Sequence, residues 1–137
     1  MRATLIVLVA CAALAVASPG GASGPQVCPA RSVGPGALVR GTTAGAACLL
    51  RAYRNGCSPA TYELSSFGVD TIATLRFQLV HGSGGCAIDV SRSFRVVPQK
   101  PHVTAVGHCK ALRRTAADIV ATGCRGTGLS ATTSLTH

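Results

Sequence analysis

The sequence predicts an α+β fold in which one N-terminal helix packs on a five-stranded antiparallel meander sheet stapled by disulfides. Three observations predict it. Residues 44–54 have the apolar spacing of a helix, three later segments alternate apolar and polar residues as half-buried strands do, and six cysteines remain after the expected processing. We therefore expect one small domain over residues 39–124.

The first segment, residues 1–17, has the pattern of a secretory signal peptide. Arg2 gives a positive start, residues 4–16 are apolar, and Ala15-Val16-Ala17 fits the site of signal peptidase. The apolar run is shorter than the roughly 20 residues that a membrane-spanning helix needs. We predict cleavage after Ala17, secretion and no transmembrane segment. The alternative is a membrane-tethered lipoprotein, because Leu8-Val9-Ala10-Cys11 matches a bacterial lipobox.

Cleavage removes Cys11 and leaves a chain of about 120 residues, the size of one domain. It also leaves an even number of cysteines, which in an exported chain predicts three disulfides. They are Cys28, Cys48, Cys57, Cys86, Cys109 and Cys124. The paired spacings that favour zinc do not occur among them, so we predict no metal site.

Residues 18–38 are rich in Gly, Pro and Ser and predict a flexible tether. The helix follows over residues 44–54. Thr43 can cap its start, and Asn55-Gly56 supplies its left-handed end. One helix face is apolar and consists of Cys48, Leu49, Ala52 and Tyr53.

Three strands are predicted from alternation over residues 60–65, 73–79 and 88–95. A two-residue turn at Gly68-Val69 sets the first register, which pairs Leu64 with Ala73, Tyr62 with Leu75 and Ala60 with Phe77. A loop over residues 82–85 sets the second, which pairs Leu79 with Ile88, Phe77 with Val90 and Ala73 with Phe94. Both turns give the same apolar face, which a one-residue slip would reverse.

Arg92 does not fit this pattern, because the register places it on the apolar face opposite Leu75. One explanation is a bulge that turns Arg92 outward. The other is a partly buried arginine that binds an acidic ligand.

The pattern is weaker after residue 101. His102–Cys109 and Asp118–Cys124 predict the last two strands, with residues 110–115 between them, and residues 125–137 predict a flexible tail. In a meander of this order, Cys57, Cys86 and Cys109 share one sheet edge, and the helix start lies near the end of the last strand. This predicts Cys48–Cys124. Cys28 then completes either Cys28–Cys57 with Cys86–Cys109, or Cys28–Cys109 with Cys57–Cys86.

The formal net charge is +9, and only Arg2 of the cations leaves with the signal. Such a charge favours an anionic surface or polymer, or an extracellular protein, as partner. Aromatic residues make up only 4% of the chain, so the stacking platforms of single-strand binders are missing and no specific nucleic acid is predicted. The outward sheet face offers Thr61, Arg76, Gln78 and Arg95. The candidate ligand-binding residues are Arg76, Arg92 and Arg95.

The acidic residues and histidines do not converge in the predicted sheet, so we predict no catalytic residues, no cofactor and no enzyme activity. The expected function is that of a secreted, monomeric, non-catalytic binding or structural domain that acts at or outside the cell surface. One alternative is a protease inhibitor that uses the loop at residues 97–101 or at Ser83. Another is a small basic secreted ribonuclease with Glu63 as base, a histidine as acid and arginines on the phosphate.

Four short segments carry a resemblance to known proteins, namely residues 47–56, 59–61, 108–112 and 121–124. In these segments the chain resembles small uncharacterised exported or lipoprotein-type domains of bacteria, over roughly residues 46–124. The resemblance implies export and a disulfide-bonded α+β domain. It implies no activity and no functional residues, and Cys11 departs from it because the surroundings of a lipidated cysteine are poorly matched.

Overall fold

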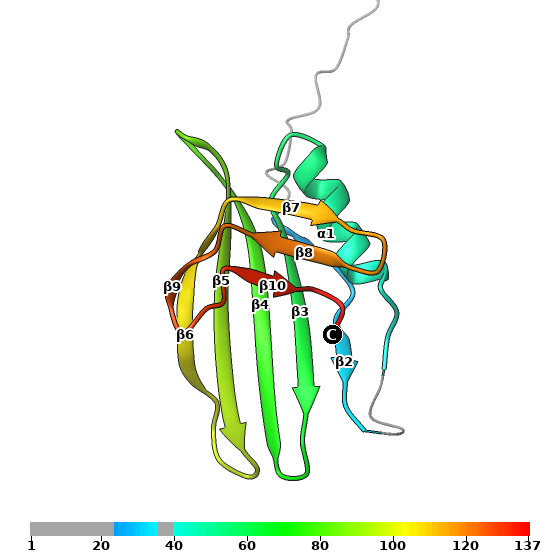
Figure 1. Ribbon diagram of the computed structural model, residues 1–137, viewed down its shortest axis with the longest axis vertical. Coiled ribbons are helices and arrows are strands. Elements are labelled where there is room, and N and C mark those ends of the chain that lie inside the picture. Colours follow the sequence, from blue (N-terminus) through cyan, green and yellow to red (C-terminus); the bar gives the residue numbers. More distant parts are fainter. Residues whose placement is uncertain (1–23, 36–39) are drawn as a thin grey trace, which may run out of the picture.

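Three long strands form the centre of the structure: β3 (Ala60–Phe67), β4 (Thr71–Gly82) and β5 (Gly85–Val96). The structure is a computed structural model, which describes residues 24–35 and 40–137 (Figure 1). The apolar side chains of these three strands alternate inward as predicted, and helix α1 (Ala44–Arg54) has the predicted bounds. The predicted signal peptide, its cleavage site and Cys11 lie outside the described residues.

The register between β4 and β5 is confirmed, with Leu79 opposite Ile88 and Phe77 opposite Val90. The register between β3 and β4 differs by two residues, so that Leu64 lies opposite Leu75. The turn is centred on Val69-Asp70 rather than on Gly68-Val69, and the Gly68 N–H donates to the Thr71 carbonyl at 2.8 Å. Because side chains alternate with a period of two, this shift keeps every residue on its predicted face.

The main sheet is larger than predicted and is mixed, with seven strands in place of a five-stranded meander. On one side β1 (Gln26–Val27) and β2 (Arg31–Val33) pair parallel with β3. On the other side β6 (His102–Cys109) and β9 (Arg125–Thr127) continue the sheet. The tether prediction is therefore wrong for residues 24–35, because their backbone hydrogen-bonds to the edge of β3.

A second, three-stranded antiparallel sheet lies across the upper part of the main sheet (Figure 1). It consists of β7 (Ala111–Arg114), β8 (Ile119–Thr122) and β10 (Thr132–Ser134). The predicted fifth strand therefore pairs outside the main sheet, because the turn closed by the Thr115 N–H and the Asp118 carbonyl at 2.8 Å folds β8 back on β7.

Helix α1 and the second sheet cover the same, inner face of the main sheet, and the core lies between them. The largest fully buried side chains come from the helix, from β3, β4 and β5, and from the C-terminal segment. They are Tyr62, Phe77, Leu49, Leu79, Ile88 and Leu135. At the helix start, Thr43 occupies the N-cap position as predicted but its side chain makes no capping hydrogen bond, and the Thr42 Oγ1 instead accepts from the Ala44 N–H at 3.2 Å. At the end, Gly56 has the predicted left-handed conformation, with φ +72°.

The disulfides are Cys28–Cys48, Cys57–Cys86 and Cys109–Cys124. The predicted Cys48–Cys124 bridge is wrong for two structural reasons. The N-terminal segment lies beside β3 and brings Cys28 to the helix, and β8 leaves the main sheet and brings Cys124 back to the end of β6. Of the pairings left open, only Cys57–Cys86 occurs.

The predicted flexible tail, residues 125–137, is instead part of the fold through β9 and β10. Leu135 is buried, and its carbonyl accepts a hydrogen bond from the Tyr62 hydroxyl at 2.8 Å. Asp118 accepts hydrogen bonds from Thr136 and from the Ile119 N–H. Burial acts to raise the pKa of the Asp118 carboxyl, but hydrogen bonds from Ser134, Thr136 and the Ile119 N–H outweigh it and lower the pKa.

The Tyr62 contact predicts a loss of stability at high pH. Burial raises the pKa of Tyr62 from 10.0 to about 12. Below pH 10 the Tyr62 phenol is protonated in both the folded and the unfolded chain, so it does not make the free energy of unfolding depend on pH. Between pH 10 and 12 it ionises in the unfolded chain alone, so the free energy of unfolding falls as pH rises, by up to about 1.4 kcal/mol per pH unit.

Tyr62→Phe should remove this part of the slope and cost about 1–2 kcal/mol at pH 7, because the Leu135 carbonyl loses its donor. Denaturant unfolding from pH 8 to 11 measures both effects. An unchanged alkaline slope in the variant would contradict the assignment.

Candidate functional site

A hollow of about 540 Å³ lies on the outer face of the main sheet, on the side away from the helix. Strands β4, β5 and β6 form its floor, and β9 forms one wall. Its lining includes the polar or charged residues Arg76, Gln78, Asp89, Ser91, His108, Arg125 and Thr127, together with Val106.

Strand register arranges the side chains of the hollow in two cross-strand rows. One row is Gln78–Asp89–His108–Arg125, and the other is Arg76–Ser91–Val106–Thr127. Directly opposed residues in a sheet point to the same side, so each row presents its side chains outward together. Arg76 and Arg125 lie at opposite ends of the two rows, three strand spacings and two residues along the strands apart, or roughly 16 Å, and bracket the other polar groups.

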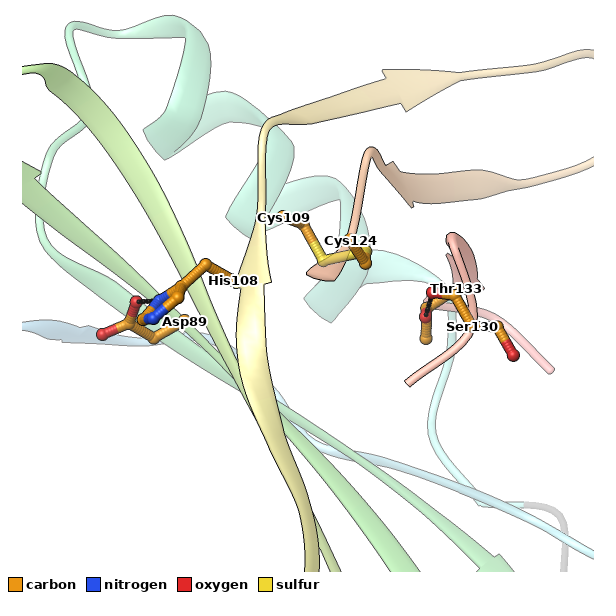
Figure 2. Close-up of a disulfide and its surroundings, with 6 residues drawn as sticks. All are labelled: Asp89, His108, Cys109, Cys124, Ser130 and Thr133. Carbon is orange, nitrogen blue, oxygen red and sulfur yellow. Dashed lines mark hydrogen bonds and ion pairs between the residues drawn. A yellow bond between two sulfur atoms is a disulfide. The ribbon is translucent and has the colours of Figure 1, made fainter. Parts of the chain in front are cut away.

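A hydrogen-bonded histidine–carboxylate pair occupies the middle of the hollow. The His108 Nδ1 lies 2.6 Å from the Asp89 Oδ1, and Figure 2 shows His108 and Cys109 leaving β6 on opposite sides. An ionised carboxylate only accepts hydrogen bonds, so Nδ1 must be the donor. Asp89 therefore fixes the orientation of the imidazole and leaves Nε2 for a ligand. It also means that the one carboxylate lining the hollow is already paired.

The two arginines are less constrained. The Arg76 Nε lies 4.0 Å from the Glu63 Oε1, and about half of each side chain is exposed, so this ion pair is weak. Arg125 is exposed and has no ion pair among the described residues. Both guanidinium groups are available to an anion that enters the hollow.

Two facing glycines bring the β9 wall close to the floor. Gly107 lies opposite Gly126, whose φ of +151° favours glycine. A Cβ added to Gly107 would collide with the Arg125 carbonyl oxygen, and one added to Gly126 would collide with the Val106 carbonyl oxygen. The position of Arg125 beside His108 therefore depends on glycine at both positions 107 and 126.

The three arginines predicted to bind ligand do not form one site. Arg76 lines the outer hollow. Arg95 is on the same face, opposite Ile72 and four residues along β5 from Ser91, about 13 Å away. Arg92 is on the inner face, opposite Leu75. Thr61, predicted to be on the open face, is buried because β1 pairs along β3.

The irregularity near Arg92 does not turn its side chain outward. Arg92 pairs with Ala105 and Ser93 with Val103, so the extra residue is Thr104 on the neighbouring strand β6. Arg92 keeps its inward register and is nevertheless exposed, because the second sheet does not reach this level.

Sequence reasoning missed Asp89, His108, Arg125 and Thr127 as members of one site. The sequence pattern predicts no register between β5 and β6, and it places Arg125 and Thr127 in the flexible tail. Of the groups that a ribonuclease would use, Glu63 lies on β3 opposite Arg76, and His108 lies on β6, three strand spacings and two residues along the strands away, or roughly 16 Å. The loop proposed for a protease inhibitor is an exposed turn in which the Gln99 N–H donates to the Val96 carbonyl at 2.7 Å.

Over residues 24–35 and 40–137, no three His, Cys, Asp or Glu side chains come together to hold a metal ion. Within the same ranges, no helix is both long enough and apolar enough to cross a membrane. Comparisons with protein-family models, curated proteins and solved structures find no match for the chain. The resemblance to exported bacterial domains therefore stays a prediction.

The glycine contact predicts the behaviour of one substitution. Gly107→Ala should destabilise the protein by about 1–3 kcal/mol, because the new Cβ meets the backbone of β9 rather than a movable side chain. Gly84→Ala is the matched control, since a Cβ there meets nothing within 4 Å. Thermal unfolding of the two variants gives the comparison, and equal stability would show that β9 does not pack as described.

Proposed function

We propose that this protein is an exported, non-catalytic binding domain that holds an anionic, hydroxyl-rich polymer of the cell surface in its outer hollow. The observation that carries the proposal is the charge of the hollow: Arg76, His108 and Arg125 surround one carboxylate, Asp89, which is already bonded to His108. The hollow therefore presents excess positive charge to a ligand.

The spacing of the cations favours a chain-like ligand. With Arg76 and Arg125 roughly 16 Å apart on the outer strands of β4, β5, β6 and β9, two anionic groups along one polymer segment can be held at the same time. Gln78, Ser91 and Thr127 lie between or beside them and supply donors and acceptors for hydroxyl groups. The exposed Val106 adds an apolar contact for a sugar or polyol backbone.

Export is the second part of the proposal. It is supported by the signal-like residues 1–17 and by three disulfides, which persist in oxidising compartments.

The binding proposal predicts a site-specific loss of retention on a sulfated polysaccharide column. Arg76→Ala combined with Arg125→Ala should elute at clearly lower salt than wild type, because both anion contacts of the hollow are lost. The matched control combines Arg54→Ala with Arg113→Ala, which removes the same charge from two exposed arginines on α1 and β7. If both double variants elute together, net charge alone explains retention and the hollow is not the site.

The export proposal predicts the mass of the protein recovered outside the cells. It should begin at Ser18 and gain two hydrogens for each of three disulfides on reduction. Intact mass spectrometry with and without reductant measures both. A product that begins at a lipid-modified Cys11 would overturn secretion in favour of a tethered lipoprotein.

A further inference from the structure

A second hollow, of about 190 Å³, lies on the inner face of the main sheet. It is enclosed by the lower halves of β3, β4 and β5, by β2, and by the loop that leads into β10. Figure 1 shows that the second sheet crosses only the upper part of the main sheet and leaves this lower part uncovered. The hollow is therefore on the opposite side of the sheet from the polymer site.

The floor of this hollow follows one cross-strand row, of which Leu64, Leu75 and Arg92 line the hollow and Arg31 lies beyond its lining. Arg31 pairs with Leu64, Leu64 with Leu75, and Leu75 with Arg92. The next row along the strands adds small or apolar residues, Val33, Ser66 and Ala73, and Leu129 covers the floor from the loop. Two leucines thus form an apolar surface beside the Arg92 guanidinium.

Arg92, the arginine that lines this hollow, has no anionic partner among the described residues. None of the side chains that line the hollow is a carboxylate, and Arg92 forms no ion pair. His137, the other basic residue of the lining, is already 3.4 Å from the Asp118 carboxylate. The Arg31 Nε is buried and has no hydrogen-bond partner. A guanidinium beside an apolar surface is best complemented by a molecule that has an apolar body and one carboxylate.

We propose that the inner hollow binds a small aliphatic carboxylate. The carboxylate lies against the Arg92 guanidinium at the exposed rim, and the alkyl chain lies over Leu75 and Leu64 toward Val33. The hollow, of about 190 Å³, has room for a short alkyl chain such as the five alkyl carbons of hexanoate, while the carboxylate stays at the rim. In this proposal, the inward-facing Arg92 binds the acidic ligand that the sequence pattern offered as one explanation for its position.

The test uses sodium hexanoate as the probe and amide NMR shifts of the full exported chain as the signal. Hexanoate should shift the amides of Leu75, Arg92 and Leu129 saturably, whereas 1-hexanol, which has the same chain and no charge, should bind much more weakly. Arg92→Gln should weaken hexanoate binding roughly tenfold or more, because a charge-assisted hydrogen bond is lost. Since Arg92 is exposed, the substitution leaves the core unchanged.

The matched control is the Arg76→Ala, Arg125→Ala variant, which should bind hexanoate as wild type does, since both residues lie on the opposite face. In the reciprocal experiment, Arg92→Gln should keep its retention on the polysaccharide column. Failure of either site therefore leaves the other testable. The proposal is overturned if hexanol binds as tightly as hexanoate, if Arg92→Gln leaves hexanoate affinity unchanged, or if the shifts fall on the outer hollow.

Discussion

Strands β4 and β5 have twelve residues each and span about 40 Å, whereas the eleven-residue helix that packs on them spans only about 16 Å. The second sheet adds strands of three or four residues. The covering layer is thus too short to bury the whole inner face. Where it lies, Tyr62, Phe77 and Leu79 are fully enclosed. Where it ends, Leu75 stays half-buried and Arg92 is tolerated on a face that would otherwise exclude charge.

The disulfides attach this short covering layer to the sheet. Cys28–Cys48 joins the N-terminal segment beside β3 to helix α1. Cys57–Cys86 joins the loop after α1 to the start of β5. Cys109–Cys124 joins the end of β6 to the loop after β8. The bridged residues are 20, 29 and 15 positions apart, and loops of this size stabilise a small domain by about 3 kcal/mol each. This compensates for a core with few aromatic residues.

Local periodicity predicted the helix, the faces of three strands and the bounds of β6, because these depend on neighbours in the sequence. What it missed depends on partners far along the chain. The two-residue strand β1 and the three-residue strands β9 and β10 are too short to show a period, and they form because an edge is available. The outer hollow was missed for the same reason: Arg125 and His108 meet only through β9, and the extra residue Thr104 hides the register of β6.

The facing pair Gly107 and Gly126 also limits how this protein can change over generations. Glycine is the only residue without a Cβ, so every coding change at either position adds atoms where the backbone of the neighbouring strand already lies. Any other residue at Gly107 or Gly126 would push β9 away from β6. The spacing between Arg125 and His108 therefore depends on keeping glycine at both positions. Gln78, Ser91 and Thr127 differ from the glycines in this respect, because their side chains can vary without moving a strand.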